Sequence, residues 1–314
     1  MPTIRKFNNT PADYQGIADL LEAITGNSHH RPENLHHMDQ IRGAEKPVAR
    51  FIVEADEKIV ALGAFGQDLW FNHADKLHLD LAVHPDFKNR GIAEELYARL
   101  IEETTRYNPS NLAVRVTEDD EESIQFWRPR DFVQVSKEPR CALDLKKFDP
   151  SKFKLSVPEG ISISTLAELQ STDSEWLRKW WHMESLILDD MATPEEPAEL
   201  RTFAQFEQDI QHPAIIPEAF FFAVDGNQFV AISGLTRYDE VTFMADLTWA
   251  IPSHQNLGIE LALKLTMLRW AKDNGATHII DEAREDDPTY QINLNLGFEH
   301  LPAWLVLEKG IIPT

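Results

Sequence analysis

Apolar residues along this chain follow two periods, and their alternation predicts strands interleaved with amphipathic helices. Between residues 76 and 83 they recur at every second position, as in a strand with one buried face. Ile92, Leu96 and Leu100 follow with helical spacing. In the first half, strands are expected at Thr3–Phe7, Val48–Glu54, Lys58–Phe65, Lys76–Val83 and Leu112–Val116, around Val133 and at Ala142–Leu145. Helices are expected at Asp13–Ile24, Gly91–Tyr107 and Glu121–Pro129, with a short one inside the polar segment 26–42.

The second half repeats this order. Its strands are expected at Ile161–Ser164, Phe220–Val224, Gln228–Thr236, Val241–Ile251, His278–Asp281 and Trp304–Leu307. Its helices are expected at Glu175–Leu188, Thr202–Ile210, Leu257–Asp273 and Pro288–Leu296. The alternation predicts an α/β fold with a mixed sheet in each half. A chain of 314 residues suffices for two domains, and Pro158 and Gly160 indicate a linker near residues 150–160. We therefore expect domains at residues 1–150 and 151–314.

A turn-like segment occurs twice, 167 residues apart, each time between a strand pattern and a helix pattern. The first copy reads Val83-His84-Pro85-Asp86-Phe87-Lys88-Asn89-Arg90-Gly91-Ile92-Ala93, and the second reads Ala250-Ile251-Pro252-Ser253-His254-Gln255-Asn256-Leu257-Gly258-Ile259-Glu260. From the glycine to a later phenylalanine there are 41 residues in the first copy and 40 in the second. A repeat near half the chain length indicates duplicated domains.

This repeated pattern resembles the GNAT superfamily of acyl-CoA-dependent N-acyltransferases, in the tandem form of mycothiol-synthase-like enzymes. The resemblance covers nearly the whole chain. The family signature is Arg or Gln, two residues, Gly, one residue, then Gly or Ala. The resemblance implies two tandem acyl-CoA N-acyltransferase domains, with acetyl-CoA as cosubstrate and a primary amine of a small molecule or peptide as acceptor.

The first copy of the turn is the better diphosphate site. Glycine allows close backbone approach, and the amides of the first helical turn point at the anion. In the second copy Glu260 places a carboxylate where the family has a small residue. Residues 1–150 carry 19 basic and 26 acidic residues, whereas residues 151–314 carry 11 and 26, so the first half repels a phosphate less. The expected cofactor-binding residues are Ala82, Val83, Lys88, Asn89, Arg90, Gly91, Ile92 and Ala93.

Two polar residues, His78 and Asp80, interrupt the strand that leads into the first turn. They share a face opposite the leucines, and polar groups in a central strand require a partner or a function. One reading makes Asp80 or His78 the base that deprotonates an ammonium acceptor; the other is a hydrogen-bonded pair or local exposure. The resemblance places Trp127 where the family often has a tyrosine that protonates the departing thiolate. It places Asp120 where the family commonly has an asparagine. We add both to the expected cofactor site.

Composition narrows the classes of partner. The net charge of −22 disfavours nucleic acid. No apolar run of about 18 residues indicates a membrane span, and a secretory signal is not evident. One cysteine fits a reducing, cytoplasmic location. The adjacent histidine pairs within residues 28–37 have poor spacing for a metal, so no metal is expected. A homodimer is left open.

The expected function is N-acetyl transfer by the N-terminal domain, with a degenerate C-terminal copy. Two alternatives stay open at this point. In one the C-terminal copy is active; in the other the chain is a non-catalytic acyl-CoA-binding or scaffold protein. The acceptor is not identified.

Overall fold

The computed structural model describes residues 3–42, 46–68, 75–192, 198, 200–282 and 288–311. These residues form two compact units. The first contains the described residues up to 137, residue 198 and the described residues from 304 onward, and the second contains the described residues of 138–192 and 200–303. This division differs from the boundary at residue 150 that we expect from the sequence, and the exchange of two strands described below accounts for the difference.

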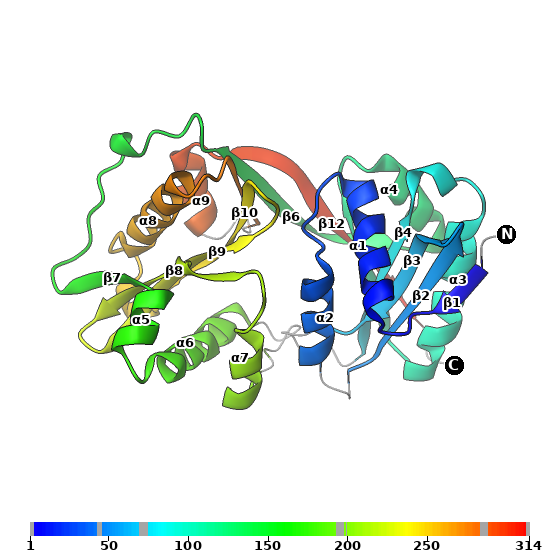
Figure 1. The fold of residues 1–314 in the computed structure, drawn as a ribbon, viewed down its shortest axis with the longest axis horizontal. Helices are drawn as coiled ribbons and strands as arrows, with labels where there is room; N and C mark the ends of the chain where they lie inside the picture. Colours follow the sequence, from blue (N-terminus) through cyan, green and yellow to red (C-terminus); the bar gives the residue numbers. More distant parts are fainter. Residues whose placement is uncertain are drawn as a thin grey trace. The chain divides into compact units, whose positions relative to one another are not determined.

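The first unit is a mixed sheet covered on both faces (Figure 1). Its strands lie in the order β1-β2-β3-β4-β5-β12. Only β4 and β5 run parallel among the pairings described within this unit. The strands are β1 (Thr3–Lys6), β2 (Val48–Ala55), β3 (Lys58–Gly66), β4 (Lys76–Val83), β5 (Asn111–Thr117) and the end of β12 (Glu299–Gly310). The helices are α1 (Pro11–Thr25), α2 (Pro32–Ile41), α3 (Ile92–Thr104) and α4 (Glu121–Trp127).

Alternation along β3 explains why this sheet has two cores. Leu62 and Ala64 pack on the α1 side with Tyr14, Ile17 and Leu20. Ala61 and Phe65 pack on the α3 side with a second group of apolar residues, which includes Leu77, Leu79, Leu96 and Leu100. The leucines of β4 therefore face α3, as the sequence pattern predicts, and His78 and Asp80 face the α1–α2 side.

The second unit has the corresponding strand order, β6-β11-β10-β9-β8-β7. Helices α8 and α9 pack on one core, and α5, α6 and α7 contribute to the other. The strands are β6 (Val133–Asp144), β7 (Ile161–Thr165), β8 (Ile215–Asp225), β9 (Gln228–Arg237), β10 (Thr242–Ala250) and β11 (His278–Asp281). The helices are α5 (Leu166–Thr172), α6 (Trp176–Met191), α7 (Phe203–Asp209), α8 (Ile259–Asp273) and α9 (Pro288–Leu296).

Each half of the sequence contributes its last strand to the sheet of the other unit. Residues 141–144 of β6 pair with β11 of the second unit, and residues 304–310 of β12 pair with β5 of the first. Leu305 and Leu307 of β12 belong to the core of the first unit. The ion pair between Lys76 Nζ and Glu308 Oε1, at 2.7 Å, adds a contact between β4 and β12. A linear split at residue 150 would remove one strand from each sheet.

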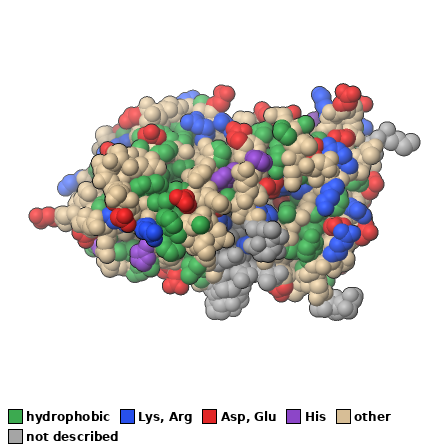
Figure 2. All heavy atoms as spheres, turned by 60° about the horizontal axis from the view of Figure 1, so that its bottom comes forward, with side chains coloured by type: hydrophobic (Ala, Val, Ile, Leu, Met, Phe, Trp, Pro, Cys, Tyr) green, Lys and Arg blue, Asp and Glu red, His purple; other side chains and the backbone are tan. Residues whose placement is uncertain are grey.

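Acidic, basic and apolar side chains are interspersed over the face of the molecule that Figure 2 shows. In the described part of the chain, no helix combines the length and apolar character that crossing a bilayer requires.

Candidate active site

The central parallel strands of the first unit separate partway along their length. β4 pairs with β5 only from Lys76 to His78, opposite Asn111 to Ala113. The rest of β4 stays paired with β3 on its other side, up to Val83. The strands therefore leave an opening beside residues 79–83, where the side of β4 turned away from β3 pairs with no described strand.

Two backbone donors of β4 face this opening. The N–H of His84 donates to Val60 O at 2.9 Å, which places it on the β3 side. Because N–H groups alternate in direction along a strand, the N–H of Ala82 also faces β3, whereas those of Leu81 and Val83 face the opening. The backbone polar groups of Val83 thus face the opening, whereas those of Ala82 are directed to β3; a cofactor contact at either residue stays a prediction.

The turn after β4 presents further donors. Asn89 and Gly91 both have left-handed backbones, with φ of 59° and 78°, and α3 begins directly after Gly91. Among the described residues, none accepts a hydrogen bond from the amides of residues 89–93. A Cβ at Gly91 would meet no atom within 4 Å, so the space above this turn is open. Main-chain donors of this kind suit an anion, and the binding of a diphosphate to them stays a prediction.

The two cationic side chains of the turn already have neighbours. Lys88 Nζ lies 2.6 Å from Glu122 Oε2, and both side chains are largely exposed. Arg90 donates to Asp86 O at 2.6 Å and stacks over Phe87, with Cζ 4.8 Å from the ring centroid. An anion held here would therefore depend first on the backbone amides, and Lys88 and Arg90 would have to change partners to reach it.

The corresponding opening in the second unit contains its own hydrogen bonds. β10 pairs with β11 only from Thr242 to Met244. The N–H of Ile251 donates to Val230 O on the β9 side. Because backbone groups alternate in direction along a strand, the N–H and C=O groups of Thr248 and Ala250 face the opening. Gln255 Nε2 donates to Ala250 O at 3.1 Å, and Thr289 Oγ1 donates to Thr248 O at 3.2 Å. The repeated turn has the same backbone conformation as the first, with φ of 62° at Asn256 and 80° at Gly258. The opening beside β10 differs, because its backbone carbonyls already accept hydrogen bonds from the side chains of Gln255 and Thr289.

A cavity of about 200 Å³ lies on the α1–α2 side of β4. Asp80 pairs with Ala64 and His78 with Gly66 in the sheet, so both residues line it from one wall. The remaining lining comes from α2, β2, β3 and nearby loops: Met38, Arg42, Val48, Arg50, Ala64, Phe65, Gly66, Gln67 and Asp68. The two polar residues that interrupt β4 therefore face this cavity.

Desolvation raises the pKa of Asp80 above its ordinary value, although the side chain is reached by solvent through the cavity. The nearby charges of His78, Arg50, Arg115 and Arg42 act in the opposite direction and lower it, in that order of size. A carboxylate whose pKa lies above its ordinary value is a stronger base than a free aspartate, and Asp80 has this property at the wall of a cavity.

Comparison with known proteins agrees with this geometry. Residues 14–132 match the acetyltransferase (GNAT) family. The whole chain also superposes on the whole of a tandem GNAT protein from the clavulanic acid biosynthesis pathway, with a TM-score of 0.77 and 16% identity. This chain contains a GNAT domain. It has the fold of a tandem GNAT protein.

Two other solved structures share the fold at low sequence identity. A GCN5-related N-acetyltransferase from Sphaerobacter thermophilus has a TM-score of 0.67 and 16% identity, covering 99% of this chain and 96% of its own. A putative acetyltransferase from Pyrococcus horikoshii has a TM-score of 0.59 and 12% identity, covering 99% and 90%. At these identities the likeness concerns the fold. The search of curated proteins gave no match.

A bulge relates Asp246 of the second unit to Asp80 of the GNAT domain. Counted back from the proline of each turn, the two acids are one residue out of phase. The pairing of β10 with β9 shifts between Ala245 and Thr248, which inserts one residue there. Asp246 and Leu247 thus lie opposite the Gly234 region, as Asp80 lies opposite Ala64. Burial raises the pKa of Asp246 as well, although its side chain is solvent-accessible.

Two expected cofactor residues have other roles in the described structure. Asp120 is the N-cap of α4 and accepts from Ser123 N at 3.0 Å. Trp127 is buried and lies edge-on to Phe132 and Tyr97 in the core. These contacts account for both residues without a cofactor, so their role in binding one stays a prediction.

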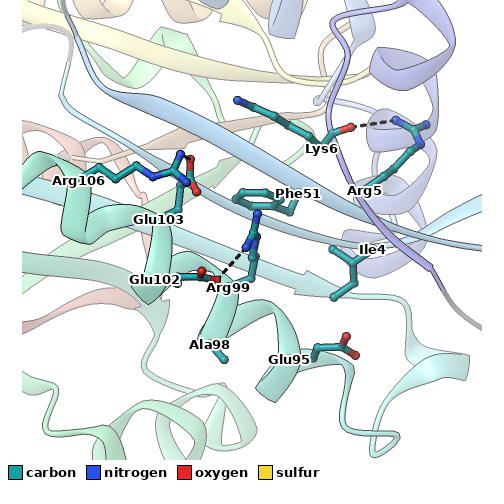
Figure 3. A pocket seen from close by; sticks show the side chains of 10 residues that line it. All are labelled: Ile4, Arg5, Lys6, Phe51, Glu95, Ala98, Arg99, Glu102, Glu103 and Arg106. Carbon is teal, nitrogen blue, oxygen red and sulfur yellow. Dashed lines mark hydrogen bonds and ion pairs between the residues drawn. The ribbon is translucent and has the colours of Figure 1, made fainter.

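A larger cavity of about 550 Å³ lies between α3 and the β1–β2 edge of the GNAT domain (Figure 3). Most of its charges are paired with one another. Arg99 lies 2.8 Å from Glu102, Arg106 pairs with Glu103, and Arg5 binds Asp13 and Glu54 outside the residues that line it. It shares no lining residue with the cavity at Asp80. We therefore place the candidate active site at Asp80 and the opening beside β4.

Proposed function

We propose that the GNAT domain is an N-acyltransferase that moves an acetyl or other short acyl group from its coenzyme A thioester to a primary amine. The observation that carries this proposal is two groups of backbone donors that have no partner among the described residues. The N–H groups of Leu81 and Val83 face the opening of β4, and the amides around Gly91 lie at the start of α3. This arrangement suits a pantetheine arm and a diphosphate in sequence.

In the proposed reaction the neutral amine attacks the thioester carbonyl carbon. A carbon–nitrogen bond forms, the carbon–sulfur bond breaks, and the electron pair leaves with the sulfur as thiolate. In this reaction the N–H of Val83, which faces the opening, polarises the carbonyl oxygen. Asp80, directly or through water, takes the proton that the ammonium loses, with His78 beside it as the second candidate. After the attack, solvent takes the second proton that the nitrogen must lose to become an amide. Solvent also protonates the departing thiolate, because the indole of Trp127 cannot donate a proton to sulfur.

The first unit is the better host for the coenzyme. In the second, the opening-facing carbonyls of Thr248 and Ala250 already accept hydrogen bonds from Thr289 and Gln255. Glu260 adds a carboxylate in the first turn of α8, next to the expected diphosphate position. We infer that the second unit is a degenerate copy. A cytoplasmic location, the absence of nucleic-acid and membrane partners, and a homodimer stay predictions.

The test uses acetyl-CoA, a panel of amines and two matched variants of the full chain. Acetyl-CoA should raise the melting temperature, and mixing it with an accepted amine should release free thiol. Asp80→Asn should lower the rate of thiol release about 10²–10⁴-fold and leave acetyl-CoA binding intact. Asp246→Asn, at the matched position in the second unit, should leave the rate unchanged. Loss of activity only in Asp246→Asn would move the reaction to the second unit, and binding without thiol release from any amine would support the non-catalytic alternative.

A further inference from the structure

The cavity at Asp80 contains an arginine without an anionic partner among the described residues. Arg42 Nη1 donates to Gln67 O at 2.7 Å, and Nε is buried with no hydrogen-bond partner. In the part of the chain that the structure describes, no carboxylate lies within ion-pair distance of this guanidinium. Burial lowers the pKa of Arg42, since its charged form has lost water.

Arg50, the second arginine of the cavity, is different. It makes two hydrogen bonds to Asp39, at 2.5 and 2.8 Å, and Asp39 also accepts from Tyr14 Oη at 2.7 Å. This network neutralises Arg50 and holds it in place. Arg42 is therefore the arginine of this cavity whose guanidinium N–H groups can bind an anionic ligand.

The position of Arg42 is shaped by the backbone below it. A Cβ on Gly66 would lie 3.2 Å from Arg42 Nη1, closer than ordinary contact. The absence of a side chain at residue 66 thus leaves room for the guanidinium over β3. Gly66 pairs with His78 in the sheet, so Arg42 lies over the end of the same strand pair that carries Asp80.

The chemistry of the two walls selects a class of acceptor. A planar guanidinium with unused N–H groups binds a carboxylate in a fork-like manner. Asp80 and Asp68 also line the cavity, which disfavours a more highly charged anion such as a phosphate dianion. A volume of about 200 Å³ is below the range typical of drug-sized ligands. Met38 and Val48 supply an apolar wall.

We propose that the acceptor is a small amino acid, whose carboxylate binds Arg42 while its amino group faces Asp80. This inference rests on the proposed function, and it names the substrate class of that same site. Simple polyamines and aminoglycosides offer only cationic groups, so they leave Arg42 without a counter-ion and are disfavoured.

The experiment compares amino acids with their decarboxylated counterparts, using the full chain saturated with coenzyme A for binding and with acetyl-CoA for transfer. Suitable pairs are alanine with ethylamine, ornithine with putrescine and phenylalanine with phenethylamine, alongside the remaining common amino acids. Binding is followed by calorimetry and transfer by thiol release. A carboxylate held by charged hydrogen bonds should improve binding, and kcat/KM where transfer occurs, about 10- to 100-fold over the matched amine.

Variants then assign the preference to Arg42. Arg42→Gln should abolish the preference for the carboxylate, and Arg42→Lys should keep part of it, because lysine retains the charge without the fork. Gly66→Ala should weaken the preference several-fold by displacing the guanidinium. Arg99→Gln, which alters a paired arginine outside this cavity, should leave it unchanged. Acetyl-CoA affinity in each variant checks that the domain is folded.

The inference is overturned if no amino acid binds more tightly than its matched amine, or if Arg42→Gln retains the full preference. This failure is distinct from failure of the proposed function. In the latter case the unmodified protein would bind no acetyl-CoA, or would release no thiol with any amine.

Discussion

The turn at Gly91 gives the sharpest prediction, because the second unit supplies a matched control. Gly91 and Gly258 have nearly the same left-handed backbone, with φ of 78° and 80°, and a Cβ at either would meet no protein atom within 4 Å. Alanine at each position should therefore cost the same backbone strain, about 1–2 kcal/mol, without a steric clash. For units of this size the melting temperature should fall by roughly 2–8 °C in both variants.

Coenzyme binding should separate the two variants. In Gly91→Ala the new methyl group occupies the open space above the free amides, where the diphosphate is proposed to sit. Losing two charge-assisted hydrogen bonds, at about 1.5–3 kcal/mol each, corresponds to at least a 100-fold weaker affinity. Gly258→Ala should keep the affinity within about twofold of the unmodified protein.

Isothermal titration with coenzyme A measures these affinities, and thermal unfolding of the free proteins measures the strain. Unchanged affinity in Gly91→Ala would refute the diphosphate assignment. If Gly258→Ala alone lost affinity, the second unit would be the binding copy. Equal losses in the two variants would mean that strain, and not local contact, controls binding.

Two further predictions concern stability. Because burial raises the pKa of Asp80, the folded protein binds this proton more tightly than the unfolded chain, so ionisation destabilises the fold as pH rises through the raised pKa. Asp80→Asn should therefore raise the melting temperature at pH 7, with the gain vanishing below the ordinary aspartate value of 3.8; a gain independent of pH would contradict this. In the second unit Lys264 is fully buried and pairs with Asp281. Lys264→Met should cost about 3–5 kcal/mol in urea unfolding by leaving a buried carboxylate, and Lys264→Met with Asp281→Leu should recover most of it; an equally unstable double variant would disprove the pairing argument.

Much of the fold could be predicted from sequence because its signals are local. The helix of residues 92–104 and the strand of residues 76–83 follow from periodicity, and the repeated glycine turns follow from a short motif. The partner of a strand is not a local property. Residues 133–144 form one strand that continues into the second unit, and nothing in their pattern distinguishes β11 from a neighbour in the first.

The candidate site follows the same division between local signals, which the sequence carries, and tertiary contacts, which it does not. Asp80 and His78 stand out because they interrupt an apolar face, and Gly91 because of its motif. Arg42 lies on a polar segment after α2, where an arginine carries no distinguishing signal, and it reaches the cavity only through tertiary packing over Gly66. Counting residues from the proline cannot reveal the bulge that brings Asp246 into register with Asp80, because such counting assumes that the two strands have equal lengths.

The exchange of β6 and β12 has a consequence for the order in which this protein matures during translation. The ribosome finishes residues 1–137 long before it makes residues 304–310, which complete the same sheet beside β5. Until then the nascent GNAT domain has an unprotected β5 edge, open to pairing with other chains. Only a polypeptide synthesised through residue 310 closes that edge, so premature termination anywhere in the second half should yield aggregates and not a shorter folded protein.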